Sequence, residues 1–178
     1  MRPYILTGGP GAGKTTLLDA LAVFGYATVE ESARAIIAER LAAGMTPRPE
    51  AAQFAREILR RDIEKYERMR DLPDPVIFDR GAVEALCSVQ EIETWSKLEL
   101  DRMLIAYPLA DPVFILPPWP AIYTVDTERD QTWEDAVKVY DKIVDWYSHC
   151  GYRLHEVPRL PVEERAKYVH RIVSRRGA

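Results

Sequence analysis

A short segment near the amino terminus combines residue types that can bind a polyphosphate. It matches the pattern G-x-x-x-x-G-K-[ST] and consists of Gly8, Gly9, Pro10, Gly11, Ala12, Gly13, Lys14, Thr15 and Thr16. Glycines allow successive backbone N–H groups to point at phosphate oxygens, and the lysine adds a charge for the β and γ phosphates. The pattern predicts a phosphate loop that binds ATP, with the Thr15 hydroxyl on Mg²⁺.

The residues on both sides of this segment support the prediction. Residues 4–7 are apolar and indicate a short buried strand, while Leu17, Leu18 and Leu21 recur at helical spacing after the segment. Gly25 is expected to end that helix. A strand, a glycine-rich loop and a helix N-terminus follow one another, as anion binding by backbone amides requires. The alternative is a glycine-rich turn before an ordinary helix.

A second candidate lies where an apolar run at residues 76–78 ends in Asp79 and Arg80. A carboxylate at the end of a buried strand can hold Mg²⁺, which prefers oxygen ligands. We therefore predict that Asp79 is a metal ligand, and the alternative is a helix cap. Arg80 stays charged, so it can hold a phosphate or an acceptor substrate, or form an ion pair with Asp79 or Glu31.

Two acidic residues, Glu30 and Glu31, follow another apolar run. Ligands bind beyond the carboxyl ends of the strands in open parallel sheets, so these positions can face a substrate. A glutamate there can accept a proton from a substrate hydroxyl, or it can place negative charge at a helix N-terminus. We assign the catalytic role to Glu31 rather than Glu30.

The stretch from Pro117 to Thr132 is rich in proline and then in charged residues, which predicts an exposed loop that closes as a lid. Arg129 in this stretch is a candidate for bringing positive charge to the transferred phosphoryl group. The alternative is a solvated surface arginine. Trp119 either lines an acceptor pocket or packs under the loop.

Length and composition indicate one domain spanning residues 1–178, with 47% hydrophobic residues. The net charge of −4 and the isoelectric point of about 5.5 disfavour nucleic acids and anionic membranes as partners. Cys87 and Cys150 are far apart in sequence, which favours free thiols and a cytoplasmic location. We expect no signal peptide and no membrane-spanning segment. The oligomeric state stays open.

The sequence contains no asparagine. It therefore lacks the N-K-x-D element by which Ras-type GTPases read guanine, and it lacks the asparagine of the protein-kinase catalytic loop. Both classes of protein are excluded. The choice between adenine and guanine is not settled by this absence.

The elements that must position these residues alternate along the chain. Short apolar runs and amphipathic helices follow one another, a pattern typical of a parallel sheet with helices on both faces. Strands are expected at residues 4–7, 27–30, 76–79, 113–116 and 152–157. Ser32 is expected to cap a helix that runs to Ala43, and further helices are expected over 133–151 and from about residue 161.

With the phosphate loop, the segment V-E-E-S-A-R and F-D-R-G in view, the chain resembles a bacterial family of small P-loop ATPases related to nicotinamide riboside kinases and, more distantly, to deoxynucleoside kinases. The resemblance implies a P-loop NTPase fold of the α/β class, with sheet order 2-3-1-4-5 and a lid at about 117–132. It also implies that Glu31 is the catalytic base. Asp79 and Arg80 match two residues of the D/E-R-S motif of deoxynucleoside kinases, and Gly81 departs from it.

Together these features predict a Mg²⁺-dependent phosphotransferase that moves the γ-phosphoryl group of ATP to a small-molecule acceptor, a nucleoside or a nucleotide. Lys14, Glu31, Asp79, Arg80 and Arg129 are its predicted catalytic residues, and Thr15 and Asp79 its metal ligands. A slow ATPase that acts as a nucleotide-dependent, partner-binding module is the main alternative. Phosphorylation of a polynucleotide end is a third possibility, which the acidic composition disfavours.

Overall fold

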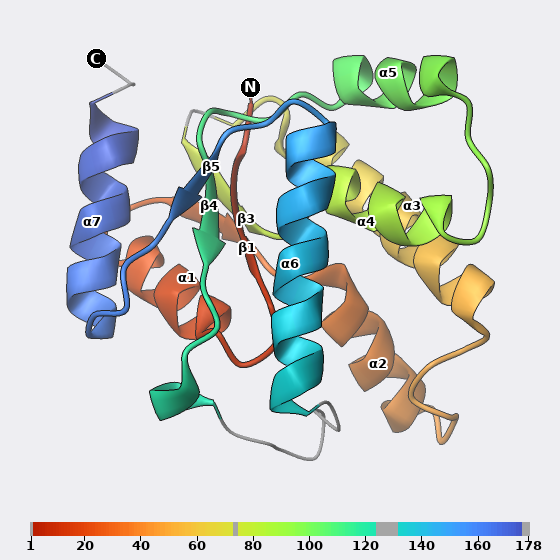
Figure 1. Cartoon of the computed structure of the whole chain (residues 1–178), viewed down its shortest axis with the longest axis horizontal. Coiled ribbons are helices and arrows are strands. Elements are labelled where there is room, and N and C mark those ends of the chain that lie inside the picture. The colour runs from red at the N-terminus through yellow and green to blue at the C-terminus, as the bar shows by residue number, and fades with distance from the viewer. Residues whose placement is uncertain (1, 73–74, 124–131, 176–178) are drawn as a thin grey trace.

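A parallel sheet forms the centre of the molecule (Figure 1). The computed structural model describes residues 2–72, 75–123 and 132–175. The strands are β1 (Tyr4–Gly8), β2 (Ala27–Val29), β3 (Val76–Asp79), β4 (Val113–Leu116) and β5 (Leu154–Glu156). They form a five-stranded sheet in the order β2-β3-β1-β4-β5, which confirms the order implied by the family resemblance.

Helices connect the strands and cover both faces of the sheet (Figure 1). They are α1 (Lys14–Ala22), α2 (Ser32–Ala42), α3 (Ala51–Met69), α4 (Ala82–Gln90), α5 (Lys97–Ala106), α6 (Trp133–His149) and α7 (Val162–Ser174), with a short 3-10 helix, η1 (Pro120–Ile122), after β4. Capping boxes fix the first turns of two helices, by Ser96 with Glu99 in α5 and Thr132 with Asp135 in α6.

Neighbouring residues of β1 point to opposite faces of the sheet, as strand geometry requires. Leu6 joins a buried cluster with Leu17 of α1 and Val169 of α7. Ile5 joins a second cluster on the other face, which includes Tyr147 of α6. The sheet is therefore covered on both sides, which explains why β1, β3 and β4 are fully buried and read as continuous apolar runs.

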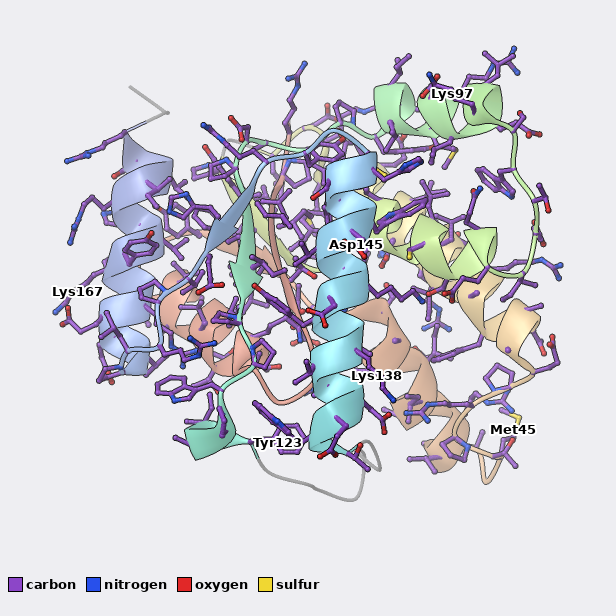
Figure 2. All side chains as sticks on the ribbon, viewed as in Figure 1. Met45, Lys97, Tyr123, Lys138, Asp145 and Lys167 are labelled. Carbon is purple, nitrogen blue, oxygen red and sulfur yellow. The ribbon has the colours of Figure 1, made fainter. Side chains whose placement is uncertain are left out.

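A third apolar cluster joins α3, α4 and α5 beyond the sheet. Its buried members include Leu59 of α3, Leu86 of α4 and Leu100 of α5. Most charged side chains lie on the outside, and Figure 2 shows Lys97, Lys138 and Lys167 extending away from the helices that carry them. In the described part of the chain, every helix is too short or too polar to cross a bilayer.

The sequence prediction is wrong about the start of α2. Its N-cap residue is Glu31, while Ser32 is the first helical residue and makes no cap. The Ser32 hydroxyl instead donates a hydrogen bond to the buried carboxylate of Asp62 in α3. A buried carboxylate needs a donor, and this long-range partner takes the hydroxyl that a local pattern assigns to the helix end.

The carboxyl ends of the strands meet at one edge of the sheet. The phosphate loop follows β1, Glu30 and Glu31 follow β2, and Arg80 follows β3. β5 is shorter than expected, at Leu154–Glu156. The order of the strands brings β1 and β3 side by side, so Leu6 pairs with Asp79. This pairing joins two sequence segments that are far apart into one site.

Candidate active site

The phosphate loop between β1 and α1 has a backbone that requires glycine. Gly8, Gly11 and Gly13 have φ angles of 137°, 74° and 80°, which side-chain-bearing residues rarely adopt. Space is also limiting, since a Cβ on Gly8 would lie 2.4 Å from the Leu116 carbonyl oxygen, and one on Gly9 would lie 2.5 Å from that of Ala136. The loop is therefore pressed against β4 and α6 in a conformation that only glycine allows.

Lys14 is the first residue of α1, and its side chain folds back over the loop. Its ammonium donates hydrogen bonds to the carbonyl oxygens of Gly8 and Gly9, each at 3.1 Å. The preceding residue, Gly13, is the N-cap, and it caps α1 with no side chain. The N-terminal end of a helix carries partial positive charge, so the loop presents Lys14 and backbone amides to the same space.

The remaining loop residues lie in the same segment. Pro10 lines the cavity beside the loop, Ala12 is buried, Thr15 is half-buried and Thr16 is exposed. The predicted nucleotide-binding residues 8–16 thus form one continuous structural unit.

Asp79, the last residue of β3, is buried, with 6% of its surface exposed. Its Oδ1 atom has no hydrogen-bond partner in the described part of the chain. Burial raises the pKa of this carboxyl group, and the charge of Lys14 opposes that shift. Gly81, not Asp79, is the N-cap of α4, so the structure argues against a capping role for Asp79. A buried carboxylate with an unmatched oxygen suits a metal or a metal-bound water.

Arg80 is held in a left-handed backbone conformation with φ of 63°. Its Nη2 donates to the Gly8 carbonyl oxygen at 3.0 Å, its Nη1 contacts Glu84 Oε1, and its Nε forms an ion pair with Glu31 Oε1 at 3.1 Å. The structure therefore brings the predicted residues Glu31 and Arg80 together and ties both to the phosphate loop. A strained backbone held by several partners is typical of functional sites.

Glu84 is a residue of this site that the sequence analysis missed. It is buried in the first turn of α4 and accepts a hydrogen bond from the hydroxyl of Thr7 in β1, besides its contact with Arg80. It thus fixes the guanidinium of Arg80 against the sheet. The signal was present in the sequence, because an acidic residue four positions after an arginine at a helix start is a favourable ion-pair spacing.

Arg165 of α7 is a second residue that the sequence analysis missed. It is 6% exposed, and its Nη1 donates to the carbonyl oxygen of Ala12 in the loop at 3.3 Å. The guanidinium lies 5.5 Å from the centroid of the Trp119 ring. It has no ion-pair partner among the described residues, its Nε atom is unsatisfied there, and burial lowers its pKa. The sequence signal was the position of Arg165, a charged residue among the apolar residues of one face of α7.

Other predicted residues lie away from these contacts or outside the described chain. Arg129 and half of the predicted lid fall in residues 124–131, which lie outside the described residues. Glu30 is exposed, and its carbonyl oxygen accepts a hydrogen bond from Lys65 at 2.6 Å. Both cysteines are free.

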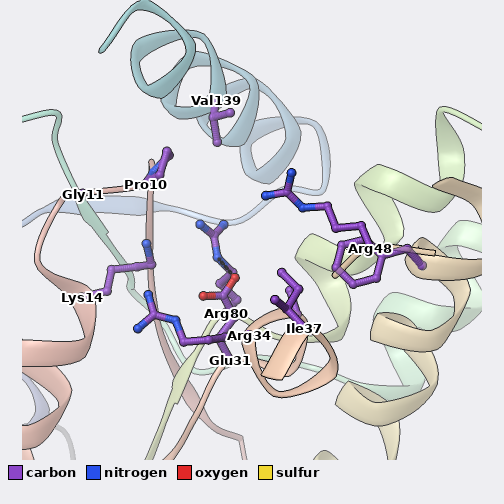
Figure 3. Close-up of a pocket in the computed structure, with 11 residues that line it drawn as sticks. Pro10, Gly11, Lys14, Glu31, Arg34, Ile37, Arg48, Arg80 and Val139 are labelled. Atoms are coloured by element: carbon purple, nitrogen blue, oxygen red, sulfur yellow. Dashed lines mark ion pairs between the residues drawn. The ribbon is translucent and has the colours of Figure 1, made fainter. Parts of the chain in front are cut away.

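A cavity of about 260 Å³ opens beside the phosphate loop (Figure 3). Its walls come from the loop and the start of α1, α2, the segment after α2, α3, the residue after β3 and α6. Its lining includes the catalytic candidates Lys14, Glu31 and Arg80. Figure 3 shows Arg34 reaching toward Lys14, and Arg48 extending into the same space from the opposite side. The cavity is concave and mixes apolar with charged groups, as small-molecule sites do.

The residues present fit a magnesium ion that is shared with phosphates and waters better than a metal centre held by protein side chains alone. No group of three or more His, Cys, Asp or Glu residues that could hold a metal occurs within residues 2–72, 75–123 and 132–175. Mg²⁺ at phosphate sites needs only one or two protein oxygens, with phosphates and waters supplying the rest. Thr15 and the unmatched oxygen of Asp79 meet that modest requirement.

Solved structures with the same fold include two proteins named as kinases. Deoxyadenosine kinase from M. mycoides with bound dATP is 14% identical over 97% of this chain and 99% of its own, with a TM-score of 0.57. Thymidylate kinase from Candida albicans is 14% identical over 99% and 92%, with a TM-score of 0.62. NadR in complex with NR is 18% identical over 97% of this chain and 52% of its own, with a TM-score of 0.71.

Among curated proteins, none matches this chain in sequence. A family model does match, and it covers residues 3–165, which include the phosphate loop, Glu31, Arg80, Glu84 and Arg165. On this evidence the chain belongs to the AAA_28 family of AAA domains and has the fold of the P-loop kinases.

Proposed function

We propose that this protein is a Mg²⁺-dependent phosphotransferase that moves the γ-phosphoryl group of ATP to a small-molecule acceptor. One observation carries the proposal: the phosphate loop opens into the same cavity that holds Glu31 and Arg80. A protein that only binds a nucleotide does not need a cavity that extends from the phosphate loop to further charged side chains. The structural similarity to kinases of small molecules supports the same interpretation.

The donor side holds the triphosphate. Backbone N–H groups of the loop other than that of Pro10, which has none, the N-terminus of α1 and the ammonium of Lys14 all present positive charge to it. Deoxyadenosine kinase, a structural neighbour, binds dATP, which supports an adenine nucleotide as donor. We assign Thr15 and Asp79 as the residues that hold Mg²⁺, directly or through water. When bound, this ion neutralises charge on the β and γ phosphates.

The acceptor side orients the nucleophile. An acceptor oxygen attacks the γ phosphorus and forms a new P–O bond, while the bond from the γ phosphorus to the β–γ bridging oxygen breaks and ADP leaves. Where the nucleophile is a hydroxyl group, Glu31 receives its proton. Arg80 fixes the Glu31 carboxylate by their 3.1 Å ion pair and supplies positive charge beside the loop. Arg129 remains a candidate for charge stabilisation from the lid.

ADP release in the presence and absence of an acceptor panel tests this proposal. The panel contains nucleosides, their monophosphates and phosphorylated and unphosphorylated sugars, all with Mg²⁺ and ATP. We expect at least one acceptor to raise ADP release, and Glu31→Gln to reduce that increase while ATP binding persists. A rate that no acceptor changes, but that a protein partner stimulates, would overturn the proposal in favour of a regulatory ATPase.

A further inference from the structure

A second cavity adjoins the one beside the phosphate loop. Its volume is about 180 Å³, and the two cavities share Glu31, Ala33 and Arg80 in their linings. One water molecule takes up roughly 30 Å³ of the liquid, so this cavity has room for one small ring. Because Glu31 is the proposed base for the attacking hydroxyl group, the rest of a bound acceptor can reach this space.

The second cavity lies between α2, α3 and α4. Ser32 of α2, Asp62 of α3 and Ser88 of α4 contribute polar groups to its wall. Ile58 and Ala85 contribute apolar groups. A wall that combines a few polar groups with aliphatic ones is typical of sites for small organic molecules.

Carboxylates outnumber cations in this lining. Glu31, Asp62 and Glu84 contribute to it, and the cation among the lining residues is Arg80. Arg80 forms its ion pairs with Glu31 and Glu84, so its guanidinium is already shared between two carboxylates. A phosphate or carboxylate group of a ligand would meet repulsion in this cavity.

Asp62 is the polar side chain of the wall that a ligand can still satisfy. Only 5% of its surface is exposed, and within the described residues its hydrogen bond comes from the Ser32 hydroxyl to Oδ1, which leaves Oδ2 unmatched. The charge of Lys65 acts on Asp62, but the Lys65 ammonium donates its hydrogen bond to the Glu30 carbonyl oxygen at 2.6 Å. Burial still raises the pKa of Asp62 to about 6. A buried carboxylate is costly unless its oxygens accept hydrogen bonds.

We propose that the second cavity holds one end of the acceptor, and that Oδ2 of Asp62 accepts a hydrogen bond from a hydroxyl or amino group of that end. The bound end is uncharged or cationic, and any phosphate group of the acceptor lies outside this cavity. This inference rests on the proposed function, in which the acceptor is a nucleoside or a nucleotide. It makes Asp62 a residue that determines acceptor specificity.

Calorimetry on the full chain tests the inference separately from turnover. The phosphate loop is first saturated with Mg²⁺ and the non-hydrolysable analogue β,γ-imido-ATP at pH 8, where Asp62 is ionised. Adenosine, guanosine, cytidine, uridine and their 5′-monophosphates are then titrated as probes. The probe that binds most tightly is compared with analogues that each lack one hydroxyl or amino group. We expect one analogue to bind about tenfold or more weakly, because it leaves the buried carboxylate oxygen unmatched.

The variant Asp62→Asn identifies the group responsible. It keeps the shape of the side chain but replaces a charged acceptor by a neutral one, so the affinity for the probe should fall by about fivefold. Removing the donor group from the probe should cost less affinity in this variant than in the unaltered protein, as expected for two groups in contact. Glu67→Gln, which removes an exposed ion pair with Arg70 at the end of the same helix, is the control and should keep the affinities unchanged.

Denaturant unfolding separates these effects from a loss of folding, because replacing a buried carboxylate whose pKa is raised should stabilise the protein at pH 8. Binding of none of the probes, probe affinity that Asp62→Asn leaves unchanged, or an equal analogue loss in the variant and the unaltered protein would each overturn the inference. Acceptor-dependent ADP release with a sugar or with any of these probes would then still uphold the proposed function.

Discussion

The donor side and the acceptor side of the candidate site are built in different ways. The donor side is one continuous segment, residues 8–16. It is defined by the backbone conformation of its glycines and by the N-terminus of α1. The acceptor side consists of side chains from α2, α3, α4 and the end of β3, joined by hydrogen bonds and ion pairs such as those of Arg80 with Glu31 and Glu84. A binding site made of backbone groups depends on the local conformation of one segment. A site made of side chains from several elements depends on how those elements pack together.

The two arginines beside the loop show what this difference means. Arg80 on the acceptor side is compensated by two carboxylates. Arg165 on the donor side also donates a hydrogen bond to the loop, yet has no carboxylate partner among the described residues. A buried and uncompensated cation is unfavourable until an anion arrives. Under the proposed function, the acceptor side is organised before its ligand binds, whereas the bound nucleotide supplies the negative charge that compensates Arg165.

Lys14→Ala is expected to have the largest effect, and it should impair nucleotide binding on the donor side while leaving the acceptor side intact. Removing the ammonium that serves the β and γ phosphates should lower acceptor-dependent turnover by at least about 100-fold. Calorimetry with Mg²⁺ and ATP should show correspondingly weak binding. Lys167→Ala, an exposed lysine on α7, is the control. Unchanged ATP binding in Lys14→Ala would mean that the loop does not hold the triphosphate.

Glu84→Gln instead disrupts the acceptor side, by removing an ion pair of Arg80. The amide keeps the shape of the carboxylate but loses the charge that compensates Arg80, so we expect an unfolding free energy lower by about 2 kcal/mol and turnover lower by about tenfold. ATP affinity should stay close to that of the unaltered protein. Denaturant unfolding and steady-state kinetics measure the two effects.

A matched control for that change lies at the other end of the same helix. Glu91, at the C-cap of α4, forms an exposed ion pair with Lys142 at 2.7 Å. Glu91→Gln should alter neither stability nor turnover appreciably, because exposed ion pairs contribute little. If Glu84→Gln and Glu91→Gln behave alike, then the buried carboxylate does not organise the acceptor side.

The sequence predicted the donor side well because the relevant information is local. A strand, a glycine pattern and a helix N-terminus follow one another within a short segment, and the structure has them in that order. The place of Asp79 and Arg80 at the end of a buried strand was predicted in the same way, from an apolar run. The sheet order came from the family resemblance, since local patterns do not specify which strands are neighbours.

The acceptor side was harder to predict because its residues meet only through packing. Glu84 becomes important once β1 and β3 place Thr7 near the start of α4. Asp62 takes the hydroxyl of Ser32, which local rules assigned to a helix cap. Arg48 reaches the cavity from a segment with no regular structure. Apart from the spacing of four residues between Arg80 and Glu84, none of these contacts is encoded in sequence spacing.

Arg165→Gln tests the difference between the two arginines and should have a smaller effect. Removing an uncompensated buried cation should leave the melting temperature of the nucleotide-free protein unchanged or raise it. The affinity for Mg²⁺ and ATP should fall by about tenfold, so the rise in melting temperature caused by the nucleotide should shrink. Arg171→Gln on the same helix is the control. A clear loss of stability without nucleotide would show that Arg165 is compensated in the folded protein.

Asp62→Asn should have the smallest effect, and it tests the charge of the buried α3 carboxylate that accepts the Ser32 hydroxyl. Burial raises the pKa of Asp62 to about 6, above its ordinary 3.8. The folded protein therefore favours the protonated carboxyl group, and this residue lowers stability as pH rises through the range from about 4 to 6. Asp62→Asn should raise the unfolding free energy at pH 7 by about 1 to 2 kcal/mol and flatten its dependence on pH over that range. Asp19→Asn, an exposed aspartate on α1, is the control, and an equal pH dependence in Asp62→Asn and the unaltered protein would contradict the assignment.

The fate of the γ-phosphoryl group tests the central claim most directly. ATP labelled at the γ phosphorus is incubated with the protein, Mg²⁺ and the acceptor panel, and the labelled products are separated and weighed by mass spectrometry. Our account predicts that the label appears in a phosphorylated acceptor, with about one ADP released for each acceptor modified. Label found only in inorganic phosphate, whichever acceptor is present, would contradict it.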